Sequence, residues 1–178
     1  NNVSTDNGGG IYIYNGDINI YNCHLSNNGS SFGGAIYVNS NGQILLENTQ
    51  LKNNSANEGG ALIVWDNGNV NLVDCIFEYN QASSFDGGGI RFYGNGELNI
   101  SNSTFKNNVS PRGGGAISIS GYQNVIGEIR NVDFIGNSVT NNYMSGGAVN
   151  LWKSAHDFIS CKFLNNLNLN GEGGALYV

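Results

Sequence analysis

The feature that most constrains this chain is an internal repeat that runs through all 178 residues. A Gly-Gly pair, a small residue and an aliphatic residue recur in that order, with successive spacings of 25, 26, 28, 27, 32 and 27 residues. The aliphatic positions are Ile11, Ile36, Leu62, Ile90, Ile117, Val149 and Leu176. Between them a second motif reads Leu or Phe, two variable residues and Asn, and it begins at Leu25, Leu51, Phe77, Phe105, Phe134 and Phe163. Repeats of this length cannot each bury their own apolar face, so they must stack on one another.

Within each repeat the apolar residues alternate with a period of two, which is the period of a β-strand. The residue two places after each aliphatic position is also apolar. A second strand precedes each Leu/Phe motif, with an apolar pair in the first four copies and with Gly127 and His156 at one of the two positions in the last two. The residue between the first two apolar positions is expected to point outward; the set is Tyr12, Tyr37, Ile63, Arg91, Ser118, Asn150 and Tyr177. The pattern predicts an all-β fold, a single-stranded parallel β-helix (β-solenoid) of about six coils of 25–32 residues, with residues 1–178 as one array.

Stacked coils place equivalent residues in columns about 4.8 Å apart. The Leu/Phe residues should form one column, and the closing Asn residues should form a hydrogen-bonded ladder of Asn28, Asn54, Asn80, Asn108, Asn137 and Asn166. The paired glycines suit a turn that needs positive φ or a close approach of backbone between coils.

Composition excludes several other classes. Glycine (27) and asparagine (33) make up about a third of the chain, which disfavours helix, and the glycines lack the three-residue period of collagen. The formal charge of −6 with only seven Lys and Arg argues against a nucleic-acid partner. No apolar run is long enough to insert in a membrane.

The alternating GGA(I/L/V) and FxxN tetrapeptides resemble the repeat of the chlamydial polymorphic outer-membrane protein family. The resemblance spans essentially the whole chain, with Gly10 and Gly89 in place of Ala and Leu25 and Leu51 in place of Phe. It implies a right-handed β-helix and a surface-exposed, often adhesive role. The right-handed crossover rule agrees with that handedness.

Both ends are expected to be open coils, because the chain starts in the tail of an FxxN segment and stops at GGALYV. Two interpretations are open: a piece of a longer array, or a filament subunit that associates end to end through its open coil edges.

Three cysteines, Cys23, Cys75 and Cys161, occupy one column, two residues before the Leu/Phe position. They are expected to be buried, reduced and structural, because two coils separate Cys23 from Cys75 and the spacing matches no metal site. Of the two histidines, His24 should point outward and His156 falls in an apolar column. Neither has a nucleophile or metal partner at a recognisable spacing, so no catalytic, cofactor or metal residue is predicted.

The main enzymatic alternative is a carbohydrate-active β-helix, a polysaccharide lyase or hydrolase, which would need carboxylates on an outer face. Glu128 and Asp157 share an outward column, with Arg130 two residues from Glu128. The simpler interpretation is a solvated face that Arg130 neutralises. Other charges alternate in sign along columns, as in Lys52, Glu78 and Lys106, or Asp133 and Lys162, which suits register-fixing ion pairs.

Six N-x-S/T sequons occur, and Asn2, Asn28 and Asn108 among them belong to the Asn ladder. Asn53 and Asn99 are the best placed for glycosylation, if the source glycosylates. Ice binding is disfavoured because the four Thr share no column. Tyr12, Tyr37 and Tyr177 could make an adhesive surface.

Taken together, the sequence favours a non-enzymatic structural or adhesive module of an extracellular or cell-surface protein. Its expected partners are a receptor or glycan on a host or neighbouring cell. The carbohydrate-active enzyme is the alternative.

Overall fold

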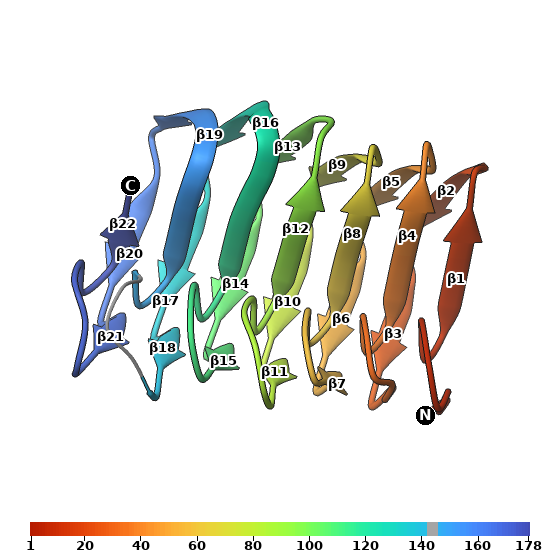
Figure 1. The fold of residues 1–178 in the computed structure, drawn as a ribbon, viewed down its shortest axis with the longest axis horizontal. Helices are drawn as coiled ribbons and strands as arrows, with labels where there is room; N and C mark the ends of the chain where they lie inside the picture. Colours follow the sequence, from red (N-terminus) through yellow and green to blue (C-terminus); the bar gives the residue numbers. More distant parts are fainter. Residues whose placement is uncertain (142–145) are drawn as a thin grey trace.

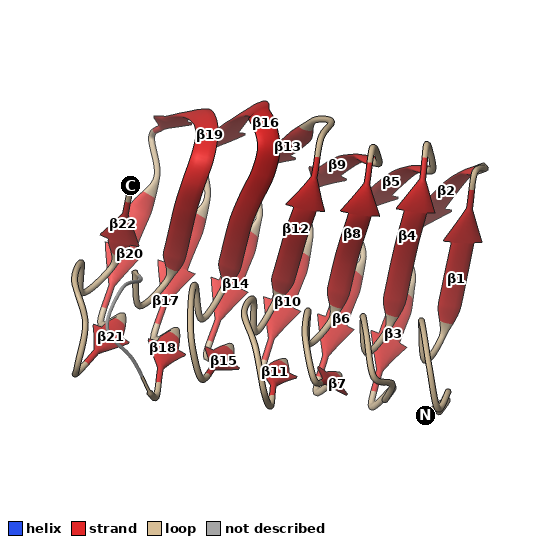
Figure 2. Ribbon diagram, in the orientation of Figure 1, coloured by secondary structure: helices blue, strands red, loops and turns tan. Residues whose placement is uncertain are grey.

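The computed structural model describes residues 1–141 and 146–178, with side chains for all of these except 122–124. These residues form strands, bends and turns, and none of them belongs to a helix that could span a bilayer. Figure 2 shows the strands as long rows that are joined by short loops.

The strands form three parallel sheets that wind together as a β-solenoid of about six coils (Figure 1). The largest sheet has two rows. The first row comprises β1 (Ile11–Tyr14), β4 (Ile36–Ser40), β8 (Leu62–Asp66), β12 (Ile90–Gly94), β16 (Ile117–Arg130), β19 (Val149–Ile159) and β22 (Leu176–Tyr177). The second row comprises β2 (Asp17–Tyr21), β5 (Gln43–Glu47), β9 (Asn69–Val73) and β13 (Leu98–Ser101), and the long strands β16 and β19 continue from the first row into it.

The two smaller sheets complete each coil. One comprises β3 (His24–Ser26), β6 (Gln50–Lys52), β10 (Ile76–Glu78), β14 (Thr104–Lys106), β17 (Asp133–Ile135) and β20 (Lys162–Leu164). The other comprises β7 (Ser55–Ala56), β11 (Gln81–Ala82), β15 (Val109–Ser110), β18 (Ser138–Val139) and β21 (Leu167–Asn168).

The register of the sheets reproduces the alignment of the repeats. Ile36 pairs with Ile11 on one side and with Leu62 on the other, and Phe77 pairs with Leu51 and Phe105. Each strand therefore bonds to its equivalent one coil away, which confirms the predicted parallel solenoid.

The paired glycines meet two separate requirements. Gly33, the first of its pair, has φ of 63°, a left-handed conformation that glycine adopts without strain. A Cβ on Gly34, the second, would lie 2.2 Å from the carbonyl oxygen of Gly60 in the next coil. Positive φ and close approach are both needed, at successive residues.

Asparagine also occupies the left-handed corners of the coils, a role that the two repeat motifs do not reveal. One corner column contains Asn22 (φ 54°), Asn48 (48°), Asn102 (50°) and Asn131 (53°), and another contains Asn27 (56°), Asn53 (55°), Asn107 (54°) and Asn165 (53°). Asparagine tolerates this region better than other residues with a Cβ. Much of the asparagine excess therefore serves to turn corners.

The core is built of continuous columns. The rings of Phe77, Phe105, Phe134 and Phe163 stack in sequence with centroids 4.7, 5.4 and 4.8 Å apart. The predicted Asn ladder is confirmed: the side-chain oxygen of Asn80 accepts from the backbone and side-chain nitrogens of Asn54, both at 3.0 Å. Asn80 in turn donates to the carbonyl of Leu51 and to Asn108, so its buried amide is satisfied.

The cysteine prediction holds in part. All three thiols are free, and Cys75 is buried, where desolvation raises its pKa. Cys161 is only partly buried. The prediction of burial is wrong for Cys23, which is exposed because it lies in the first coil and only one neighbouring coil packs against it.

Candidate functional site

The two acids predicted from the sequence do share a column. Glu128 and Asp157 are register partners on β16 and β19. Both side-chain oxygens of Glu128 accept from Arg130, at 2.8 Å from Nε and 2.9 Å from the terminal nitrogen. This pairing lowers the pKa of Glu128, whereas a general acid needs a raised one. The geometry matches the neutralised, solvated face.

The predicted ion-pair column is also present. The Lys52 ammonium lies 2.6 Å and that of Lys106 3.5 Å from the two oxygens of Glu78, and these contacts lower the Glu78 pKa, with Lys52 the larger cause. Asp133 and Lys162 are register partners on β17 and β20.

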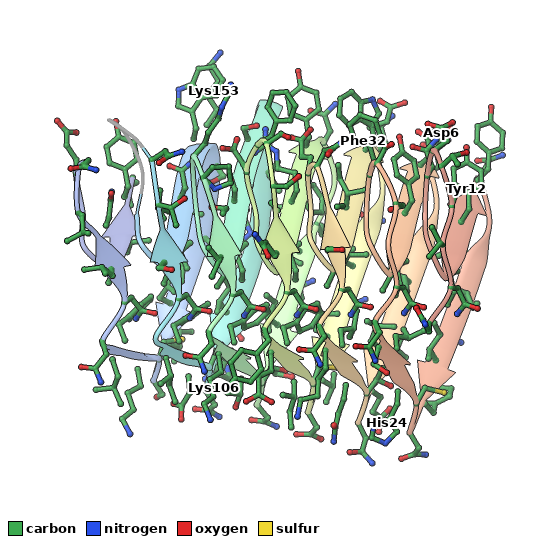
Figure 3. The ribbon with its side chains drawn as sticks, turned by 90° about the horizontal axis from the view of Figure 1, so that it is seen from below. Asp6, Tyr12, His24, Phe32, Lys106 and Lys153 are labelled. Atoms are coloured by element: carbon green, nitrogen blue, oxygen red, sulfur yellow. The ribbon has the colours of Figure 1, made fainter. Side chains whose placement is uncertain are left out.

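The histidines lie in contrasting environments. His24 is exposed, as predicted, on the side opposite Tyr12 (Figure 3). His156 sits in the inward column beside Gly127, and neither of its ring nitrogens has a hydrogen-bond partner. Burial lowers its pKa to about 4.

The prediction that the second residue of each first-row strand points to solvent is wrong in the middle of the molecule. These residues form one column, the second-position column, and Tyr37, Ile63, Arg91 and Ser118 in it are 7%, 0%, 6% and 0% exposed. Only Tyr12 at the N-terminal end is freely exposed, at 50%. Tyr37 is thus lost as a surface residue, and burial raises its pKa to about 12.

A second layer of chain covers this column. The residues just before each Gly-Gly pair bond to one another between coils and form a loop column of Asn7, Phe32, Glu58, Asp86 and Gly113. Figure 3 shows Phe32 and Asp6 on the same side of the solenoid as Tyr12. Strand alternation identifies the outer face of a strand but carries no information about a loop that folds over it.

Arg91 is the centre of the most polar part of this two-layer region. Its Nε donates to Glu58 at 2.8 Å, and its terminal nitrogens donate to Ser118 at 2.9 Å and to Ser120 at 2.8 Å. The carboxylate of Asp86 lies 3.6 Å from the same guanidinium. Arg91 therefore joins its own strand to the loops of two coils and to β16.

A cavity of about 420 Å³ opens beside this cluster. Its lining comprises Asp86, Arg91, Tyr93, Ser120, Asn150, Trp152 and Tyr177. The loop column contributes no side chain at Gly113, where a Cβ would lie 2.9 Å from the Asn150 side-chain nitrogen and 3.1 Å from an Asp86 oxygen. The missing side chain helps to keep the cavity open.

The electrostatics of the cavity are nearly balanced. Arg91 faces two carboxylates, but burial raises the pKa of Asp86 despite the opposing effect of Arg91, Arg112 and the Gly113 backbone. The described residues hold no cluster of His, Cys, Asp or Glu that could bind a metal ion. The chemistry on offer is hydrogen bonding by hydroxyl, amide, carboxyl and guanidinium groups between aromatic side chains.

Two sequence signals could have located this cluster. Acidic residues directly precede the Gly-Gly pair in two successive repeats, at Glu58 and Asp86, and a lone Arg stands in a column that is otherwise uncharged. Each of these two signals points to the cluster only once it is known that the loop column packs on the first-row strands.

The two proposed glycosylation positions differ. Asn53 is exposed at a corner, whereas Asn99 is half-buried, with its side-chain nitrogen 3.2 Å from the Asn71 oxygen and its own oxygen accepting from the Glu128 backbone. Asn28 and Asn108 are buried in the ladder, as predicted.

Comparison with known proteins agrees with this architecture. A family profile described as a right-handed β-helix region matches residues 1–128. The chain belongs to this right-handed β-helix family. No curated protein and no solved structure shows significant similarity to it.

Proposed function

We propose that the chain is a non-enzymatic structural and adhesive β-helix module of an extracellular or cell-surface protein. The proposal includes kinship with the chlamydial polymorphic outer-membrane protein repeat, which the GGA(I/L/V) and FxxN motifs suggest. The module presents a binding face to a receptor or glycan on a host or neighbouring cell.

The observation that carries the proposal is a line of exposed aromatic side chains along the first row of strands. Tyr12 and Tyr14 on β1, Trp65 on β8 and Trp152 on β19 are 50%, 66%, 36% and 57% exposed. Aromatic residues at a surface are typical of recognition sites, because they bury large area with little loss of side-chain entropy. A rigid solenoid holds them in line.

Satisfied ladders in the interior support a structural role. The Asn and Phe columns run through successive coils, and Arg130 engages Glu128 of the acid pair suggested by the sequence. These features serve rigidity rather than turnover.

Binding tests the adhesive part of the proposal. Labelled module should bind to intact cells or to an immobilised glycan panel, and the triple variant Tyr12→Ser, Tyr14→Ser, Trp65→Ser should lose most of that binding. Tyr21→Ser is the matched control, because Tyr21 is 47% exposed on β2, outside the first row. Equal binding by the triple variant and the control would contradict the assignment of this face.

An antibody against the module tests its location. It should label intact cells of the organism that makes the protein, and labelling only after permeabilisation would contradict a surface location.

One observation favours the carbohydrate-active enzyme as a second candidate: Asp86, in the cavity, has the raised pKa that a general acid needs. Incubation with neutral and acidic polysaccharides, with detection of reducing ends and unsaturated products, decides between the two. We expect no turnover by the wild type. Turnover that is lost in Asp86→Asn or Glu128→Gln would replace the non-enzymatic proposal.

A further inference from the structure

The cavity beside Arg91 lies at an interruption in a column of aromatic residues. The fourth residues of the first-row strands form this aromatic column, in which Trp65 pairs with Tyr93, Tyr93 with Ser120, and Ser120 with Trp152. The rings of Trp65 and Tyr93 contact each other with centroids 4.6 Å apart. Ser120 then replaces an aromatic residue, and Trp152 follows on the other side.

The interruption has the height of one ring. Neighbouring strands are about 4.8 Å apart, so Tyr93 and Trp152 are separated by roughly 9.6 Å along the solenoid axis. Because non-bonded carbon atoms pack at about 3.5–4 Å, the two side chains leave room for one further ring, beside the Arg91 guanidinium, whose carbon lies 5.3 Å from the centroid of the Tyr93 ring. Lys153, whose ammonium lies 4.8 Å from the centroid of the Trp152 ring, restrains the indole by a cation–π contact.

Polar groups lie along the inner edge of this space. The Ser120 hydroxyl accepts from Arg91, so its own proton is available to a ligand. Asp86 supplies carboxyl oxygens, and Asn150 supplies an amide that also donates to Ser118 at 3.4 Å. A ligand that fits must therefore combine an apolar ring face with hydroxyl groups around its edge.

The charges select a neutral ligand. Among the described residues that line the cavity, Arg91 alone is cationic, and its guanidinium already bonds to Glu58, Ser118 and Ser120 and lies beside Asp86. An added carboxylate would face Asp86 and Glu58 without a cation of its own, which is costly in a partly buried site.

We propose that this cavity binds one neutral pyranose ring of a glycan, between Tyr93 and Trp152, with its hydroxyl groups on Asp86, Ser120 and Asn150. The proposal rests on the adhesive function given above and names the chemical class of its ligand. The aromatic side chains contact the C–H faces of the sugar, and Asp86 accepts from its hydroxyl groups.

The molecule contains its own comparison site. Asn39 interrupts the same column between Tyr14 and Trp65. There the second-position neighbours are Tyr12, Tyr37 and Ile63, which offer no counterpart to the Arg91 and Asp86 cluster. A ring-sized interruption without the polar edge should not select a sugar.

The two tryptophans, Trp65 and Trp152, make the test direct. In Trp65→Phe the fluorescence reports on the cavity, and in Trp152→Phe it reports on the comparison site. The probes are the methyl glycosides of glucose, galactose and mannose, with methyl glucuronoside and phenol as acidic and aromatic comparators. At least one neutral glycoside should give a saturable change in Trp65→Phe, with a dissociation constant on the order of 1 mM, as expected for a ligand of this size.

Adding Asp86→Ala to Trp65→Phe should weaken that binding at least tenfold, roughly the loss of one charge-assisted hydrogen bond. Thermal unfolding of each variant confirms that the fold is kept. The inference is overturned if no neutral glycoside gives a saturable change, if the glucuronoside or phenol binds as well, or if Trp65 in Trp152→Phe responds equally.

Cell binding separates this inference from the proposed function. If intact cells bind wild type and Asp86→Ala equally and no glycoside binds, the sugar site is wrong and the adhesive face stands. If a glycoside binds but the module binds no cell or glycan panel, the adhesive function fails and the sugar site stands.

Discussion

The second-position column is uncharged and largely apolar in its first half and polar in its second. In β4 and β8 it contains Tyr37 and Ile63, and the loop glycine Gly33 packs against Ile63, whereas in β12 and β16 it contains Arg91 and Ser118, and Arg91 bonds to Glu58 and lies beside Asp86. The backbone register is the same in both halves. One scaffold can therefore hold either an apolar or a charged two-layer contact, and the charged one lies beside the cavity lined by Asp86, Ser120 and Asn150.

The inward columns show the same contrast. The column of Ile18, Ile44, Val70 and Leu98 is apolar, but its last two members are Gly127 and His156. In both columns the later coils contain polar residues where the earlier coils contain apolar side chains. Substitutions in the two halves should therefore change the free energy of unfolding with different dependences on pH.

Removal of the Arg91 side chain should have the largest effect. Arg91→Met leaves Glu58 and Asp86 without their cation in a region where Arg91 is 6% exposed, and this should cost about 3–5 kcal/mol at pH 7. Urea unfolding, monitored by circular dichroism, measures this change in the free energy of unfolding. The triple variant Glu58→Gln, Arg91→Met, Asp86→Asn is the control and should recover most of the loss. A triple variant as unstable as Arg91→Met would mean that the guanidinium acts by packing alone.

In the apolar half, Ile63→Ala should cost about 2–4 kcal/mol, because a fully buried side chain leaves a cavity. The cost should stay constant between pH 4 and 8, unlike that of Arg91→Met, which should shrink on acidification as the Asp86 carboxyl, whose pKa burial raises, is protonated. A cost below about 0.5 kcal/mol would place Ile63 at the solvent surface.

These two residues also mark the limit of what the sequence could predict. The Gly-Gly and Leu/Phe motifs predict the register of every coil, because stacked coils repeat the same backbone contacts, such as the approach of Gly34 to Gly60. Arg91 and Ile63 were placed outward because alternation along a strand distinguishes its two faces only. Whether the outer face is covered depends on the loop column, whose residues change in type between coils, from Phe32 to the acids Glu58 and Asp86 and then to Gly113.

The same reasoning applies to the candidate acids. The pairing of Glu128 with Asp157 followed from the repeat alignment, and so did the neighbouring Arg130. Asp86 and Trp152 were not singled out, because the cavity depends on an absent side chain at Gly113 and a small one at Ser120.

The inward column makes a pH-dependent prediction. His156 has a folded-state pKa of about 4 against an ordinary 6.5, so the unfolded chain binds a proton that the folded chain rejects between those values. Stability should therefore fall as pH falls from 6.5 to 4, by about 3 kcal/mol in total. His156→Leu, which restores the apolar column, should lose that part of the pH dependence. An unchanged profile would show that His156 is solvated in solution.

The smallest effects come from two carboxylates with opposite shifts. The pKa of Asp86 is raised by burial, so its ionised form destabilises the fold, and the penalty grows as pH rises from the unfolded-state pKa to the folded-state pKa and stays constant above it. Asp86→Asn should therefore raise stability at pH 7 relative to wild type, with no gain at pH 3.

The pKa of Glu78 is lowered by Lys52 and Lys106, so the stabilising contribution of its carboxylate is present above the unfolded-state pKa and is lost on acidification. Glu78→Gln should lower stability at pH 7 by about 0.5–1 kcal/mol and leave it unchanged at pH 2. Asp86→Asn and Glu78→Gln remove the same charge but should shift stability at pH 7 in opposite directions, because the Glu78 carboxyl lies between two lysines and the Asp86 carboxyl is buried in the loop column. Shifts of the same sign would show that the Asp86 carboxylate is stabilised by Arg91 more than it is penalised by burial.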